Sequence, residues 1–200
     1  TINVIQRKQK IGIVKKQDIL ENQANYAYLA IGSNLGKKVY NLINVKFILS
    51  KNNIHIIQSS SFYLTRSWPN PKFPKYVNAV LFIKTNLSLD KLFKKIKYIE
   101  KLLGRINAPK NYPRICDIDI IDFNGKFYKL SNIDLIVPHP RMDKRNFVLL
   151  PLYEINKRWI HSKYKKNIVN LISNLKSDDI RSIKLIWFND IIILCLILMI

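Results

Sequence analysis

Two segments with helical periodicity separate four strand-like segments along the middle of this chain, and their order restricts the possible folds. Apolar residues recur every three or four positions over residues 37–51 and 88–103, which predicts two helices with one apolar side each. Ser88 can cap the second helix, and Gly104 ends it. The first apolar side consists of Val39, Leu42, Val45 and Leu49. The second consists of Leu89, Leu92, Phe93, Ile96, Ile99, Leu102 and Leu103.

Strands are expected where β-branched and aromatic residues gather, over residues 26–31, 54–64, 77–85 and 114–123. The resulting order, β-α-β-β-α-β, is that of ferredoxin-like α+β folds, in which an antiparallel sheet carries both helices on one face. The segments after the last strand are expected to add helices to this unit. With 200 residues, of which 48% are hydrophobic, the chain can form one domain with its own core.

The two ends of the chain differ from the middle. Residues 1–25 are polar and contain no apolar stretch long enough for a signal peptide, so we expect a poorly ordered extension. Residues 26–176 form the expected domain, and residues 177–200 form a tail that ends in the apolar run Ile191–Ile200. A membrane helix needs about 20 apolar residues, so this run is interpreted as a buried final element or an incorrectly assigned chain end. A membrane tail anchor is the alternative.

The chain carries a net charge of +21, which has two interpretations. One is a solvated, lysine-rich surface, and the other is a surface that binds an anionic partner such as a nucleotide or nucleic acid. The two cysteines, Cys116 and Cys195, lie far apart in the sequence and do not predict a disulfide. Their reduced state favours a reducing compartment, and we therefore expect a cytoplasmic protein.

Two carboxylates interrupt the apolar strand over residues 114–123. Asp117 and Asp119 are two residues apart, so both side chains point to one face of the strand, and Cys116 points to the other. Burying two like charges is costly unless a cation neutralises them, and Mg²⁺ prefers such oxygen ligands. Without metal, the two carboxylates are expected to lack a structural partner. The alternative is an edge strand on which both carboxylates simply face water.

Arginines gather around this strand, although the chain has few of them. Arg forks match the geometry of phosphate oxygens, so arginines beside two carboxylates favour a site for a metal-bound polyphosphate. His139 lies between two prolines in the same region and can donate a hydrogen bond to a phosphate oxygen. The arginines are Arg105, Arg114, Arg141 and Arg145.

Seven stretches in order, which cover roughly residues 26–161, resemble one known family. They are "AYLAIGSNLG", "SSFYLT", "FPKYVNAV", "IEKLLGR", "PRICDIDIIDFNG", "VPHPRMDKRNFVLLPL" and, more weakly, "EINKRWIH". The combined R-x-x-D-x-D and P-H-P-x(4)-R-x-F patterns are specific to 6-hydroxymethyl-7,8-dihydropterin pyrophosphokinases, enzymes of folate biosynthesis with a ferredoxin-like fold. The resemblance implies transfer of pyrophosphate from ATP to the hydroxymethyl group of the pterin, with release of AMP.

The resemblance also assigns residues. It implies that Asp117 and Asp119 hold two Mg²⁺ ions, and that Arg105 and Arg114 act with them in catalysis. The ATP site carries over as Glu100, Arg105, Lys110, Arg114, Ile120, His139 and Arg145. The pterin site carries over as Thr65, Tyr76, Asn78 and Phe147.

The chain departs from the family pattern at several positions. Asn107 stands where a second arginine is common, so one phosphate contact depends on Lys110, and Arg66 stands where proline is common. The segment "SWPNP" replaces a form that more often contains glycine. The loops over residues 67–75 and 105–113 are expected to close over the substrates and exclude water.

Two other functions fit parts of the pattern. An RNA-binding module would suit the fold and the charge, but the RNP1 motif is missing and the carboxylates would repel a phosphate backbone. A two-metal nucleotidyl transferase would release pyrophosphate instead of AMP. We expect ATP and the pterin as the only partners, with no nucleic acid, no membrane contact and a monomeric chain.

Overall fold

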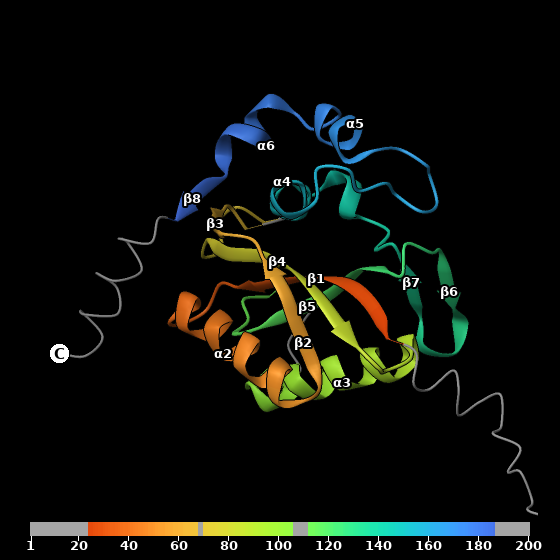
Figure 1. Cartoon of the computed structure of the whole chain (residues 1–200). Helices are drawn as coiled ribbons and strands as arrows, with labels where there is room; N and C mark the ends of the chain where they lie inside the picture. Colours follow the sequence, from red (N-terminus) through yellow and green to blue (C-terminus); the bar gives the residue numbers. More distant parts are fainter. Residues whose placement is uncertain (1–23, 68–69, 106–111, 187–200) are drawn as a thin grey trace, which may run out of the picture.

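The computed structural model of the chain describes residues 24–67, 70–105 and 112–186. Almost all of the expected N-terminal extension, and the whole apolar run Ile191–Ile200, lie outside these residues. The described part forms three layers, with helices on both faces of one sheet (Figure 1).

The central layer is a six-stranded antiparallel sheet of order β5-β1-β4-β3-β8, in which β2 also pairs with β4. Strand β4 therefore pairs with β1 along one edge, and with β2 and β3 in succession along the other. This arrangement confirms the expected ferredoxin-like α+β fold. The strands are β1 (Asn25–Ser33), β2 (Ile54–Ser59), β3 (Phe62–Thr65), β4 (Tyr76–Thr85), β5 (Asp117–Phe123) and β8 (Lys184–Ile186).

The segment 54–64, expected as one strand, forms two strands because the regular strand pairing is interrupted at Ser60 and Ser61. The backbone of Ser60 donates to the Val80 carbonyl at 2.9 Å, and its hydroxyl accepts from the Val80 N–H at 2.9 Å. The Ser61 N–H instead bonds to the carboxylate of Glu154, at 3.0 and 3.1 Å. Serine and glutamate side chains thus replace backbone partners at this point, which the run of strand-forming residues does not reveal.

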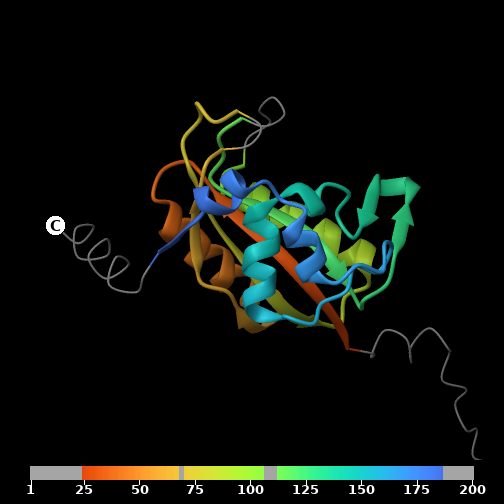
Figure 2. The ribbon, with the colours of Figure 1, turned by 90° about the horizontal axis from the view of Figure 1, so that it is seen from above.

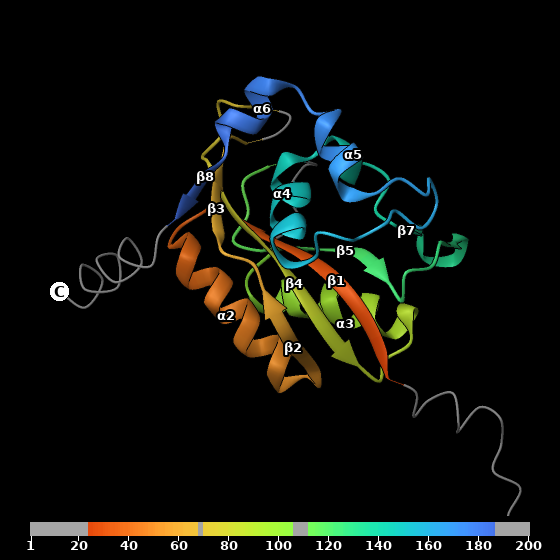
Figure 3. The same ribbon diagram turned by 45° about the horizontal axis from the view of Figure 1, so that its top comes forward.

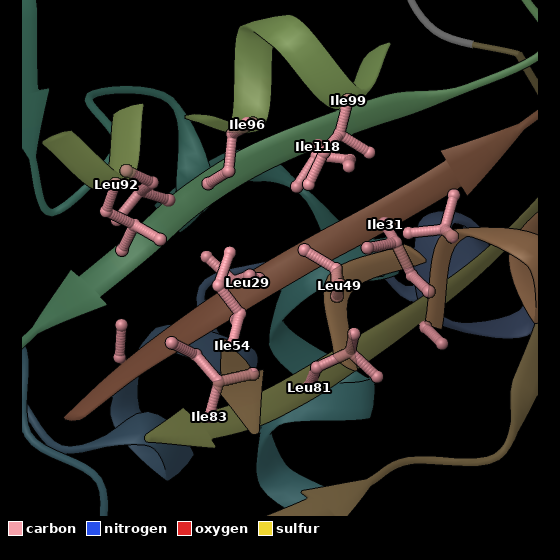
Figure 4. Close-up of a cluster of buried hydrophobic side chains, with 14 of the residues drawn as sticks. Leu29, Ile31, Leu49, Ile54, Leu81, Ile83, Leu92, Ile96, Ile99 and Ile118 are labelled. Atoms are coloured by element: carbon pink, nitrogen blue, oxygen red, sulfur yellow. The ribbon is translucent and has the colours of Figure 1, made fainter. Parts of the chain in front are cut away.

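Helices α2 (Lys38–Lys51) and α3 (Leu89–Leu102) cover one face of the sheet, as Figure 1 shows. All four predicted apolar positions of α2 are buried, which confirms that pattern. Figure 4 shows how side chains from both helices meet those of β1, β4 and β5 in one apolar cluster. This cluster includes Leu29, Leu49, Leu81, Ile96 and Ile118, each at most 1% exposed.

The apolar side of α3 differs from the prediction at its C-terminal end. Leu102 is 58% exposed, whereas Glu100 is buried beside Ile96 and Ile99. Glu100 lies four residues after Ile96, so helical geometry places it on the core-facing side, and Leu102 falls on the opposite side. Gly104 follows with φ +87°, a left-handed conformation that glycine adopts without strain and that ends the helix as predicted.

A second apolar cluster fills the other face of the sheet. Helix α4 (Asn146–Ile155) lies across β1 in the view from above (Figure 2). Its residues Leu149 and Leu152 pack with Val80 and Ile121 of the sheet. The alternation of side chains along β5 places the consecutive residues Ile120 and Ile121 in opposite clusters. Strand β5 therefore contributes to both cores.

The C-terminal part of the described chain belongs to the same body. Strand β8 pairs with β3 at the sheet edge, so residues 184–186, which the sequence assigned to a tail, extend the sheet (Figure 3). No helix within the described ranges is long and apolar enough to cross a membrane. The remaining elements are β6 (Tyr128–Leu130), η1 (Ser131–Ile133), β7 (Leu135–Val137), η2 (Met142–Lys144), α5 (Ile168–Ser173) and α6 (Ser177–Ser182).

His161 organises the loop between α4 and α5. Its side chain is buried, and its Nδ1 atom accepts hydrogen bonds from the backbone N–H groups of Lys163 and Tyr164, both at 3.2 Å. The imidazole also stacks on the Tyr164 ring, with centroids 4.4 Å apart. Burial lowers the pKa of His161, although the charge of Asp143 opposes this effect. The loop therefore requires the neutral imidazole.

This lowered pKa predicts a loss of stability in mild acid. A histidine whose pKa is lower in the folded than in the unfolded protein stabilises the fold above its unfolded pKa of about 6.5, and this contribution is lost as the pH falls. The melting temperature should therefore be lower at pH 5.5 than at pH 7.5. The His161→Asn variant keeps an acceptor near the Nδ1 position and should show a shallower dependence on pH. An unchanged dependence would show that His161 does not contribute.

Candidate active site

A cleft opens where the C-terminal end of β1 meets the N-terminal ends of β4 and β5. Antiparallel pairing places Gly32 between Asn78 on β4 and Asp117 on β5, so residues from three strands form one row across its floor. The cleft has a volume of about 230 Å³. Its polar and charged lining residues are Thr65, Arg66, Tyr76, Asn78, Lys97, Arg105, Arg114, Asp117, Asp119, His139, Arg141 and Arg145.

Both predicted carboxylates face this cleft, and each already has cationic partners. Asp117 accepts hydrogen bonds at Oδ1 from Arg105 at 2.9 Å and from Arg114 at 3.1 Å. Asp119 accepts at Oδ2 from Arg145 at 3.0 Å. The expectation that the carboxylates lack a structural partner without metal is therefore wrong. Arg105 and Arg145 lie 12 and 26 residues from the carboxylates that they bind, so the local pattern could not show these two pairs. Arg114 lies only three residues before Asp117.

Arg145 is the main charge that compensates Asp119. Burial alone would raise the pKa of Asp119, but the charges of His139, Arg145 and Lys97 outweigh it, and the pKa is lowered. The Nε2 atom of His139 lies 3.8 Å from Asp119 Oδ2. Burial lowers the pKa of His139 itself, so this imidazole is largely neutral at pH 7. The guanidinium of Arg145, 10% exposed, remains as the permanent positive charge beside Asp119.

Glu100 connects the end of α3 to the start of β5. Its Oε1 atom accepts the backbone N–H of Ile118 at 2.8 Å and pairs with Arg105, while Oε2 pairs with Lys97 at 2.9 Å. Burial raises the pKa of Glu100, and its cationic neighbours oppose that rise. The side chain does not line the cleft. It holds the strand between the two aspartates, whereas the resemblance assigned it to the ATP site.

The four residues that the resemblance assigned to the pterin lie together at the other side of the cleft. Asn78 donates from Nδ2 to the Thr65 hydroxyl at 2.8 Å, and both side chains are buried. Tyr76 and Phe147 line the same space, and Arg145 lies 5.5 Å from the centre of the Phe147 ring. Aromatic faces beside a fixed carboxamide suit a flat heterocycle with polar edges.

One residue that the resemblance assigned to ATP, Ile120, lies in the apolar core. Ile120 is 4% exposed and belongs to the cluster under α2 and α3, because alternation along β5 points its side chain to the face opposite Asp119. Its side chain therefore does not line the cleft, and its assignment to ATP stays a prediction. Lys110, assigned to ATP, and Asn107 lie outside the described residues.

Lys97 and Asn34 are site residues that the sequence analysis missed. Lys97 lines the cleft one helical turn before Glu100, a spacing that the periodicity of α3 could have revealed. Asn34 exchanges two hydrogen bonds with the backbone of Arg114, at 3.1 and 2.7 Å, and donates to the Pro74 carbonyl at 3.2 Å. It thereby holds the backbone at Arg114 and Pro74 beside the cleft. The ring centroids of Phe73 and Tyr112, which neighbour these contacts in sequence, lie 5.7 Å apart.

Comparison with known proteins identifies the family. A sequence profile described as 7,8-dihydro-6-hydroxymethylpterin-pyrophosphokinase (HPPK) matches residues 28–157. The chain belongs to this family. The resemblance drawn from the sequence motifs is thereby confirmed.

Individual relatives agree with this family. A 2-amino-4-hydroxy-6-hydroxymethyldihydropteridine pyrophosphokinase of Haemophilus influenzae is 38% identical over 130 residues, which cover 64% of this chain and 80% of the relative. Folic acid synthesis protein FOL1 of Dictyostelium discoideum is 42% identical over 141 residues. That match covers 68% of this chain but 20% of the longer protein, and a Pneumocystis carinii relative is covered to 22%. The chain thus spans about a fifth of these two HPPK relatives.

Solved structures support the HPPK fold. A variant of Plasmodium falciparum HPPK-DHPS, crystallised with pterin and p-hydroxybenzoate, superposes with a TM-score of 0.64 at 18% identity. The match covers 83% of this chain and 48% of that chain. At this identity the similarity supports the fold alone.

The ion pairs predict different costs for removing each carboxylate from the metal-free protein. Asp119→Asn should lower the free energy of unfolding by about 1–3 kcal/mol, because Arg145 loses a carboxylate partner in a partly buried site. Asp117→Asn should cost less, because Arg105 keeps its ion pair with Glu100. Urea unfolding in the presence of EDTA measures both values. Unchanged or higher stability of the Asp119→Asn variant would contradict compensation by Arg145.

Proposed function

We propose that this domain transfers pyrophosphate from ATP to the hydroxymethyl group of 6-hydroxymethyl-7,8-dihydropterin, a step of folate biosynthesis. The observation that carries the proposal is the row across the cleft floor, with Asn78 at one end and Asp117 at the other. A slot for a flat heterocycle therefore lies directly beside a carboxylate and arginine cluster for a polyphosphate. Membership of the HPPK family supports the same pair of substrates.

The donor set of the cleft fits magnesium. Asp117 and Asp119 supply two hard oxygen ligands from one face of β5, and a metal ion would replace the arginines that now bind them. No group of three or more possible metal ligands occurs among the described residues, so water and phosphate oxygens would complete the coordination. When bound, two Mg²⁺ ions would neutralise the phosphates of ATP and the charge that develops during transfer.

The arginines have two roles in this proposal. In the free protein they hold the carboxylates in place, and in the complex they turn to phosphate oxygens. Guanidinium forks match these oxygens, so Arg105, Arg114 and Arg145 exchange one anionic partner for another. The cleft lining contains six arginine and lysine side chains against two carboxylates, so an excess of positive charge faces the phosphates.

His139 is positioned as a neutral hydrogen-bond donor. Its Nδ1 atom accepts the backbone N–H of Arg141 at 3.1 Å, so in the neutral ring the proton resides on Nε2. Nε2 is the atom that points toward Asp119. The same N–H can donate to a phosphate oxygen once the nucleotide occupies the cleft.

The reaction is a direct displacement. The hydroxymethyl oxygen of the pterin forms a bond to the β-phosphorus, the bond from that phosphorus to the oxygen bridging to the α-phosphorus breaks, and AMP leaves with that oxygen. The hydroxyl proton is released. No covalent bond to the protein forms, so the chain contributes position and electrostatic stabilisation. Tyr76, Asn78 and Phe147 would hold the ring so that its hydroxymethyl group faces the phosphates.

The alternative functions are less consistent with the fold. An RNA-binding sheet needs an open face, whereas α4 covers the sheet face opposite α2 and α3 and buries Val80 and Ile121 there. A nucleotidyl transferase is distinguished from the proposed pyrophosphokinase by its product, because it would release pyrophosphate and not AMP. We retain the cytoplasm as the proposed location, supported by the buried free thiol of Cys116.

Product analysis tests the proposed reaction. With Mg²⁺ and ATP, AMP should form only when the hydroxymethyl pterin is added, together with the pterin pyrophosphate. Asp117→Asn and Asp119→Asn should each lower turnover by about a thousandfold or more, because each removes an anionic metal ligand. Asp178→Asn, on the exposed first turn of α6, is the matched control and should keep full activity. Release of pyrophosphate from ATP would instead indicate a nucleotidyl transferase.

A further inference from the structure

Gly32 is a glycine that the backbone conformation does not require. The other glycines among the described residues, Gly36, Gly104 and Gly125, have φ of +62°, +87° and +63°. Gly32 does not adopt a positive φ, and it lies within β1 with strand neighbours on both sides. Glycine in the interior of a strand is unfavourable, and it often marks the close approach of another group. The reason for this glycine must therefore lie in its surroundings.

The neighbouring group is the carboxamide of Asn78. A Cβ atom at position 32 would lie 2.7 Å from Asn78 Oδ1 and 3.4 Å from a ring carbon of Tyr76. The first distance is far below a normal van der Waals contact, and the second is close to one. The carboxamide cannot turn aside freely, because its Nδ2 donates to Thr65, whose side chain is 2% exposed. Only glycine leaves room for this orientation.

The orientation has a chemical consequence. Thr65 holds Nδ2, so Oδ1 is the carboxamide atom on the side of Gly32, which lines the cleft. A carbonyl oxygen accepts hydrogen bonds, so the site selects a heterocycle that presents N–H donors along one edge. An amide turned by a side chain at position 32 would no longer present this acceptor. A site built on such a fixed acceptor discriminates strongly against rings that lack the matching donor.

We propose that Gly32 is a specificity-determining position that acts through Asn78: the missing side chain keeps the Asn78 carboxamide aimed at the donor edge of the pterin ring. The inference rests on the proposed function for its ligand. It concerns the pterin side of the cleft alone, because the three heavy atoms nearest to a Cβ at this position belong to Asn78 and Tyr76. Binding of the nucleotide beside Asp117 should therefore be preserved when the glycine is replaced.

A double-mutant cycle with Gly32→Ala and Asn78→Ala tests this inference. Calorimetry would measure the affinity for the hydroxymethyl pterin in the presence of Mg²⁺ and a saturating non-hydrolysable ATP analogue. Gly32→Ala should weaken pterin binding by at least about tenfold, since it displaces a hydrogen-bond acceptor from its partner. The affinity of the Gly32→Ala variant for the nucleotide analogue alone should stay within about twofold of the wild-type affinity. Unchanged pterin affinity would overturn the proposal.

The melting temperature supplies a second readout that needs no ligand. In the presence of Asn78, Gly32→Ala should lower the melting temperature because of the clash. In the Asn78→Ala background the same change should leave it equal or raise it, because alanine is more favourable than glycine in a strand. Equal losses in both backgrounds would overturn the proposed contact. If the wild type binds nucleotide but not the pterin, the proposed function fails, while the melting temperatures still decide whether Gly32 accommodates Asn78.

Discussion

Arginine side chains bind both Asp117 and Asp119 inside the cleft and offset their negative charges. Arg105 and Arg114 pair with the first carboxylate and Arg145 with the second. Without these pairs, two like charges on one strand face would repel each other in a partly buried site. The same guanidinium groups suit phosphate oxygens, so the interaction that stabilises the free protein also prepares it for an anionic substrate.

The rest of the fold keeps this charge arrangement in register. Strand β5 is the shared element, because alternation along it places Ile120 in one core and Ile121 in the other. The strand cannot slide without disturbing both cores. Glu100 adds a direct hydrogen bond to the backbone between the two aspartates, and Asn34 binds the backbone just before them. The aspartates are thus held by buried contacts on either side, as a preorganised site requires.

The local pattern of the sequence predicts the fold and the composition of the site, but not the contacts within it. Periodicity placed both helices, and the alternation of β5 placed Asp117 and Asp119 on one face. The interruption at Ser60 and Ser61 was not predictable, since Ser61 is bound by Glu154, which is 93 residues away in the chain. The ion pairs of Arg105 and Arg145 and the space beside Gly32 likewise arise between segments that only the tertiary structure brings together. Ile120 was assigned to ATP by the resemblance alone, and the alternation that places the two aspartates on one face places its side chain on the other.

Nucleotide binding with and without magnesium tests the central claim most directly. Titration of a non-hydrolysable ATP analogue into the protein by calorimetry would give the affinity in Mg²⁺ and in EDTA. If the aspartates hold the metal and release their arginines to the phosphates, removal of Mg²⁺ should weaken binding by at least about a hundredfold, or about 2.7 kcal/mol. Equal affinity under both conditions would contradict the account. The arginines would then bind the phosphates while they remained paired with the carboxylates, and no metal would be needed.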